Sequence, residues 1–181
     1  MRLFIAVNIN QHSKKFIEKK VELLKNEYKG RFKWTKKENW HLTLKFIGEA
    51  SAEEKDELIQ ALKKIDFKEQ NQYVQFNKLG AFPDLKKAEV LYLALKRGRN
   101  LLESLHDKVE RELLEYGFEA DERAYIPHLT LGRSGSKPVQ ISENFESEYF
   151  VNIFARLESI SLYQSRLKAE GPEYIELFSI K

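Results

Sequence analysis

The tetrapeptide His-Leu-Thr-Leu occurs twice in this chain, beginning at His41 and again 87 residues later at His128. The chain has only four histidines and three threonines, and two of each fall in these matched pairs. An imidazole has an ordinary pKa of about 6.5, so near neutral pH one ring can accept a proton while another donates one. Threonine hydroxyls can donate hydrogen bonds to phosphate oxygens, where charge develops during phosphodiester chemistry. The repeat therefore predicts acid–base chemistry on a phosphodiester without a metal.

Each tetrapeptide sits in an apolar, partly alternating stretch that predicts a β-strand. Side chains of a strand point alternately to its two faces. Alternation puts three polar side chains of the first copy on one face, namely His41, Thr43 and Lys45. The second copy does the same with His128 and Thr130, while the leucines of both copies point the other way, toward a core. Two such strands facing one cleft would gather two imidazoles and two hydroxyls around one small volume.

A single His-x-Thr on a strand is more often structural than catalytic, and the duplication is what favours a catalytic interpretation. His12 and His106 have no threonine partner, and we interpret both as surface or structural residues. A zinc site needs about three or four Cys, His or carboxylate ligands, whereas the motifs offer hydroxyls and the chain has no cysteine. A Gly-x-Ser-x-Gly nucleophile motif, a P-loop and a dinucleotide-binding glycine motif are all missing from the sequence. We therefore expect neither a metal nor a cofactor.

The bulk properties indicate one globular domain covering residues 1–181, with 42% hydrophobic residues and 12% aromatics. The first residues are too briefly apolar for a signal peptide, and no stretch approaches the length of a membrane span. With no cysteine, the composition fits a reducing compartment, and we expect a cytoplasmic protein. The net charge of +3 is a weak indication of nucleic-acid binding. Four basic residues before the first motif are equally consistent with a route to a phosphate site and with a solvated strand edge: Arg31, Lys33, Lys36 and Lys37.

Periodicity along the chain predicts an alternation of strands and helices. Helices are expected over 13–28, 51–64 and 99–116. Strands are expected over 2–8, 31–35, 40–47, 72–80 and 89–96, at the second motif after Pro127, and in three short pieces of the tail at 149–151, 160–163 and 174–178. Each half of the chain thus contains strands, a long helix and one motif. We expect an α+β fold of two duplicated lobes, each an antiparallel sheet with helices, that meet at a central cleft.

At these residues the chain resembles the two-histidine (2H) phosphoesterase superfamily, and within it the LigT-like RNA 2′,3′-cyclic phosphodiesterases, also called 2′-5′ RNA ligases. The likeness runs over nearly the whole chain. It is carried by five stretches: Arg2 to Val7, Trp40 to Glu49, Leu79 to Pro83, Pro127 to Arg133, and Leu162 to Ser165 with Tyr174. The paired His-x-Thr motifs are highly specific for the superfamily and less so for an RNA substrate.

The resemblance implies a bilobal fold with a pseudo-twofold axis, and hydrolysis of an RNA 2′,3′-cyclic phosphate to a 2′-phosphate. By analogy, His128 activates water as the base and His41 protonates the leaving 3′ oxygen. Thr43 and Thr130 then hold the phosphate oxygens. Arg133 matches a family arginine near the phosphate, although strict alternation favours a surface charge at the end of the strand. Three more expectations follow: Lys45 adds positive potential, the partner is an RNA end such as a tRNA fragment, and the protein is a monomer.

Three alternatives stay open at this point. The same site can run in reverse and join a cyclic end to a 5′-hydroxyl, although water at about 55 M favours hydrolysis. A protein of the same fold can act on a small cyclic nucleotide. A non-catalytic RNA-binding module can use a basic, aromatic rim. Stacking of Tyr125 on a base is a further possibility that the sequence does not favour.

Overall fold

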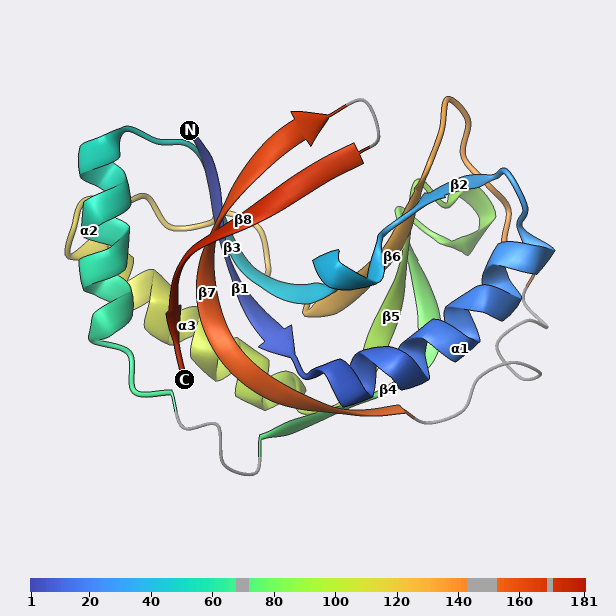
Figure 1. Cartoon of the computed structure of the whole chain (residues 1–181), viewed down its shortest axis with the longest axis horizontal. Coiled ribbons are helices and arrows are strands. Elements are labelled where there is room, and N and C mark those ends of the chain that lie inside the picture. The colour runs from blue at the N-terminus through green and yellow to red at the C-terminus, as the bar shows by residue number, and fades with distance from the viewer. Residues whose placement is uncertain (68–71, 143–152, 169–170) are drawn as a thin grey trace.

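The fold, obtained as a computed structural model, contains in its described residues an antiparallel sheet of eight strands with three α-helices packed around it (Figure 1). The structure describes residues 1–67, 72–142, 153–168 and 171–181. The helices are α1 (Gln11–Glu27), α2 (Ala52–Lys63) and α3 (Arg99–Leu114), with short 3₁₀ turns η1 (Lys37–Asn39) and η2 (Leu85–Lys87). The strands are β1 (Arg2–Ile9), β2 (Phe32–Trp34), β3 (His41–Glu49), β4 (Tyr73–Phe82), β5 (Val90–Arg97), β6 (His128–Ser134), β7 (Ile153–Lys168) and β8 (Gly171–Ile180).

The strands follow the order β1-β3-β6-β5-β4-β7-β8, and β1 also pairs with β7. Six strands therefore form a closed circuit, with β8 paired to the outer edge of β7 and β2 to β6. The long β7–β8 hairpin rises above the rest of the sheet in Figure 1. The two motif strands, β3 and β6, are neighbours in the circuit. The fold thus brings together two segments that lie 87 residues apart in sequence.

Most predicted elements are confirmed. Helices expected over 13–28, 51–64 and 99–116 are found within a few residues of those bounds as α1, α2 and α3. Local capping explains the starts of two of them, because Asn10 accepts a hydrogen bond from the Ser13 amide and Ser51 forms a capping box with Glu54. The tail forms β7 and β8, while the strand predicted over 149–151 lies outside the described residues. In the described part of the chain, no helix combines the length and apolarity needed to cross a bilayer.

The core lies between the helices and the leucine face of the sheet. Leu42, Leu44, Leu129 and Leu131 are all at most 2% exposed and belong to one cluster with the apolar faces of the three helices. Burial of a leucine side chain contributes roughly 1.5–3 kcal/mol to stability. The motif leucines therefore fix which face of each strand is internal, and the histidines and threonines occupy the opposite face.

Both motif strands contain the same irregularity of register. Between β1 and β3, Ala6 pairs with Thr43 but Ile5 pairs with Lys45, so Leu44 is an extra residue. Between β5 and β6, Tyr92 pairs with Thr130 but Leu91 pairs with Gly132, and Leu131 is the extra residue. An extra residue of this kind reverses the faces of the residues that follow it. Strict alternation therefore fails after the fourth residue of each motif.

Candidate active site

The two motifs meet at a single pair of residues. Leu42 of β3 is paired with Leu129 of β6, and both side chains are fully buried. Because the two strands are antiparallel, extending this pairing by one residue in each direction places His41 opposite Thr130 and Thr43 opposite His128. Each histidine thus lies beside the threonine of the other copy, on the sheet face opposite the core. The structure therefore brings all four predicted residues together.

The same hydrogen bond orients each imidazole. His41 Nδ1 lies 2.7 Å from the carbonyl oxygen of Asn39, and His128 Nδ1 lies 2.7 Å from that of Ile126. A carbonyl can only accept, so Nδ1 must carry the hydrogen in both rings. Nε2 of each neutral ring is then free to accept a proton. In the first copy, His41 Nε2 lies 3.1 Å from Thr43 Oγ1, which can donate to it.

Burial lowers the pKa of both histidines. The effect is largest for His41, whose pKa falls to about 4; the charges of Lys14 and His128 lower it further, and the bond to Asn39 opposes the shift. Burial also lowers the pKa of His128, with a smaller contribution from Arg133. With protein groups alone, both rings are therefore neutral near pH 7. An anion between them has the opposite effect, because a nearby negative charge favours the imidazolium.

Aromatic rings surround both histidines. His41 lies among Phe4, Tyr174 and Tyr163, with ring centroids at 5.0, 5.4 and 6.2 Å. On the other side, His128 lies 5.0 Å from Tyr92 and 5.1 Å from Phe82. No sequence pattern assigned these aromatics a role, and Tyr92 lies outside the stretches that resemble the family. They come from β1, β4, β5, β7 and β8, so only the strand pairing reveals them.

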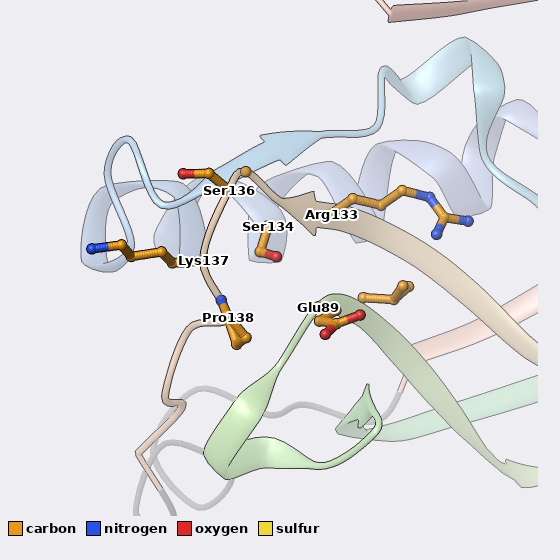
Figure 2. Close-up of a pocket in the computed structure, with 8 residues that line it drawn as sticks. Glu89, Arg133, Ser134, Ser136, Lys137 and Pro138 are labelled. Atoms are coloured by element: carbon orange, nitrogen blue, oxygen red, sulfur yellow. The ribbon is translucent and has the colours of Figure 1, made fainter.

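Arg133 lies on the histidine face, because the extra residue Leu131 shifts it there. Arg133 is the cross-strand neighbour of Val90 of β5. Val90 lies two residues from Tyr92, and the ring of Tyr92 packs against His128. The Arg133 guanidinium adds to the lowering of the His128 pKa by burial and opposes the raising of the Tyr174 pKa by burial, so its charge acts on both sides of the site. Figure 2 shows Arg133 extending away from the loop of Ser136, Lys137 and Pro138 and above Glu89, beside a cavity of about 390 Å³.

Lys45 does not share the face of His41, so that prediction was wrong. The extra residue Leu44 turns Lys45 to the core side, opposite the fully buried Ile5, and leaves the lysine 4% exposed. Its ammonium pairs with Glu110 of α3 at 2.6 Å. Phe46 takes the place on the histidine face that Lys45 was expected to occupy, and it is 63% exposed.

The remaining sequence observations are readily placed. The ring of Tyr125 stacks on His106, with centroids 4.3 Å apart, and its hydroxyl donates to the carbonyl of Thr43. His12 is exposed on α1 and contacts Phe16. In the basic segment, Lys33 of β2 is the cross-strand neighbour of Arg133 of β6. The ammonium of Lys37 forms an ion pair with Glu18 of α1.

Two histidine–threonine pairs presented by adjacent strands of a closed antiparallel sheet define the class of two-histidine phosphoesterases. The chain belongs to the LigT-like phosphoesterase family, whose profile matches residues 11–92 and 94–174.

Curated relatives agree with this assignment. The chain is 33% identical over 178 residues to a protein of Methanocaldococcus jannaschii named RNA 2′,3′-cyclic phosphodiesterase, covering 96% of each chain. It is 31% identical over 182 residues to the protein of the same name from Archaeoglobus fulgidus, covering 98% of each.

Solved structures show the same fold. A crystal structure of a Thermus thermophilus protein superposes with a TM-score of 0.81 at 20% identity, covering 99% of this chain and 96% of that one. The E. coli LigT protein complexed with 3′-AMP superposes with a TM-score of 0.72 at 21% identity and the same coverage.

Proposed function

We propose that this protein hydrolyses the 2′,3′-cyclic phosphodiester at RNA ends and leaves a 2′-phosphate. The observation that carries the proposal is the matched tautomer of His41 and His128. Each ring donates from Nδ1 to a backbone carbonyl two residues upstream, so each Nε2 is available for proton transfer. The names of the curated relatives support the same reaction.

The proposed step uses one histidine as base and the other as acid. Water attacks phosphorus and gives a proton to His128 Nε2, the bond from phosphorus to the 3′ oxygen breaks, and His41 Nε2–H protonates that oxygen. The 2′ oxygen keeps the phosphate. A lowered pKa suits His128, because a base must begin neutral. His41 must begin protonated, and the anionic phosphate supplies the raised pKa that this requires.

Thr43 and Thr130 hold the non-bridging phosphate oxygens in this proposal, and Arg133 adds a cation at the rim. The place of each threonine beside the histidine of the other copy supports this role. Hydrogen bonds of this kind act where charge increases in the transition state, which is where they accelerate a reaction most.

The fold is proposed to be a single domain, residues 1–181, made of two related lobes. Three observations support duplication. The order of a strand, a helix and a motif strand occurs as β1-α1-β3 and again as β5-α3-β6, if the short strand β2 between α1 and β3 is left aside. Both pairs share one register with the same extra leucine. The family profile matches one segment in each half.

The proposed partner is an RNA end, such as a cleaved tRNA fragment, and the protein is proposed to act as a cytoplasmic monomer. One chain supplies both histidines and both threonines, so the site needs no second copy. Size-exclusion chromatography with light scattering tests the monomer, and comparison of cleaved tRNA with a short oligonucleotide tests the substrate.

The decisive experiment is incubation with an oligonucleotide that ends in a 2′,3′-cyclic phosphate, followed by identification of the ribose oxygen that keeps the phosphate. We expect a 2′-phosphate, with full activity in excess EDTA. A 3′-phosphate product, or a loss of activity that only metal restores, would contradict the scheme. Turnover of a mononucleotide cyclic phosphate at an equal rate would favour the small-nucleotide alternative, and binding without turnover would favour an RNA-binding module. Adding a 5′-hydroxyl oligonucleotide tests the reverse, joining reaction.

A further inference from the structure

The interior position of Lys45 raises the question of what this buried charge does. An ammonium that is 4% exposed is costly unless it is fully paired. Lys45 donates to Glu110 Oε1 at 2.6 Å, to the carbonyl of Glu119 at 2.8 Å and to Asp121 Oδ1 at 3.5 Å. These contacts match the three donors of an ammonium. The charge is therefore satisfied entirely by α3 and by the segment that follows α3.

That segment, residues 115–127, joins α3 to the second motif strand. All of it is described, and it contains neither a helix nor a strand. Lys45 anchors its middle through Glu119 and Asp121, and the amide of Asp121 donates to Glu110 Oε2 at 3.4 Å. A residue four positions after His41 thus fixes the segment that leads to His128.

Tyr125 fixes the end of the same segment. Its hydroxyl donates to the carbonyl of Thr43 at 3.0 Å, and its ring is held face to face against His106 of α3 with an interplanar angle of 9°. The next residue, Ile126, supplies the carbonyl that orients His128. A continuous path of contacts therefore runs from Thr43 on one motif strand to the imidazole on the other.

We infer that Lys45, Glu110 and Tyr125 form a brace that positions the ring of His128 relative to His41 and Thr43. These are positioning residues, because none of them faces the phosphate site. The inference rests on the proposed function, since the geometry that the brace maintains is that of the two proton-transferring rings. An error of about 1 Å in such geometry can cost about 10²-fold in rate.

A metal site at the same place is a weaker interpretation. Ligand atoms of His106, Glu110 and Asp121 lie within 4.8 Å of one another. The ammonium of Lys45 already pairs with both carboxylates, so a cation would have to displace it. The cluster is therefore better explained as the charged part of the brace.

The sharpest test removes one hydroxyl. We expect Tyr125→Phe to lower kcat about 5- to 20-fold on a cyclic-ended oligonucleotide, with KM within about twofold and melting temperature nearly unchanged. Tyr116→Phe is the matched control, because Tyr116 lies in the same segment and its ring packs beside the exposed Lys64. An unchanged kcat for Tyr125→Phe, or an equal loss in both variants, overturns the brace.

A second variant tests the charged part. The double change Lys45→Met with Glu110→Leu removes both partners, and such replacements are often neutral for stability. We expect about a 10²-fold loss of kcat in a folded protein. If the double variant is folded and its kcat is within twofold of the parent, the brace is overturned; if it does not fold, the Tyr125→Phe result decides.

An NMR readout separates failure of the brace from failure of the proposed function. Tyr125→Phe should shift the ring resonances of His128, whereas Tyr116→Phe should not, whether or not the parent protein turns over RNA. If the parent is inactive on cyclic ends but the shift is seen, the proposed function fails and the brace stands. If the parent is active and the shift is absent, the brace fails alone.

Discussion

The surroundings of His41 and those of His128 differ although their motifs are identical. Around His41, the outer edge of β7 is covered by β8, which contributes Tyr174 to the wall. On the His128 side, strand β4 takes the place that β7 has beside His41. It pairs with β7 only over residues 73–76, so among the described strands the rest of β4 has β5 as its one neighbour. The additional strand β8 contributes to the burial that lowers the pKa of His41.

Polar groups differ between the two sides as well. Beside His41, Tyr163 donates to Asn8, Asn8 donates to Ser159 and Ser161, and Ser161 donates to Glu176. Beside His128, the structure places the exposed cation of Arg133. The same kind of backbone contact thus orients each ring, whereas the strands around the two rings differ. These surroundings alone keep His41 neutral, so the acid role proposed for His41 depends on the charge of the bound phosphate.

The largest expected effect comes from removal of either ring. His41→Ala and His128→Ala should each lower kcat about 10²- to 10⁴-fold, because each removes a positioned proton transfer. Binding of the oligonucleotide should change little. His12→Ala, at an exposed histidine, is the control. Steady-state kinetics and a binding titration check this, and a variant of either motif histidine that keeps more than half the activity would exclude the two-histidine scheme.

Loss of a threonine hydroxyl should have the next largest effect. Thr43→Val and Thr130→Val keep the shape of the side chain but remove a donor to the phosphate, and we expect kcat to fall about 10- to 10³-fold. Thr35→Val changes the third threonine, which lies outside both motifs, and should leave kcat unchanged. Equal kcat in all three variants would mean that the motif hydroxyls do not contact the reacting phosphate.

Removal of the Arg133 charge should weaken substrate binding. Arg133→Met is expected to raise KM about tenfold. This corresponds to the lower end of the free energy of a hydrogen bond to a charged group, and we expect the lower end because the Arg133 side chain is exposed. It should also raise the pKa of His128, since the guanidinium lowers it. Lys137→Met, at the same cavity, is the control. An unchanged KM would leave Arg133 as a surface charge.

The pH dependence should differ between free and bound protein. Both histidine pKa values are lowered in the protein alone, and a bound phosphate anion raises them, by about 1–3 units at close range. The bell-shaped profile of kcat should therefore lie at higher pH than that of kcat/KM. Both limbs report the coupled pair rather than single residues. Rate profiles at saturating and at low substrate check this, and coincident profiles would contradict it.

The smallest change tests the wall of His41 directly. Tyr174→Ala opens the side that β8 covers, so the pKa of His41 should rise from about 4 toward 6.5, while that of His128 moves less. Tyr73→Ala, at a half-exposed tyrosine, is the control. Histidine titration by NMR measures both values. Equal movement of the two pKa values would show that β8 is not the source of the difference.

Local patterns in the sequence were enough to predict the elements and the four motif residues. The helices follow from apolar periodicity and caps such as Ser51, and the burial of Leu42 and Leu129 follows from alternation. The repeated motif predicted only that the two strands face one cleft; that β3 and β6 are paired neighbours in one sheet follows from the topology and was not predicted.

The orientations of Lys45 and Arg133 could not be predicted, because both depend on an extra residue in the strand. Nothing in Leu-Lys-Phe marks that residue in the first copy; in both copies it is defined by the register with β1 and β5. One local signal was available at Gly132, where an added Cβ would lie 3.2–3.3 Å from atoms of β2. A glycine in a strand often marks a close approach of another backbone, which is the case here.

The carbonyl that holds each imidazole comes from the backbone two residues upstream. Ring tautomer is therefore set by a backbone contact within a stretch shorter than one strand. A copy of that short peptide therefore carries the contact that orients its histidine ring, and the residues around it can differ between the two copies. Under the proposed duplication, both halves would receive this contact at once, and later change would need only to make them unequal.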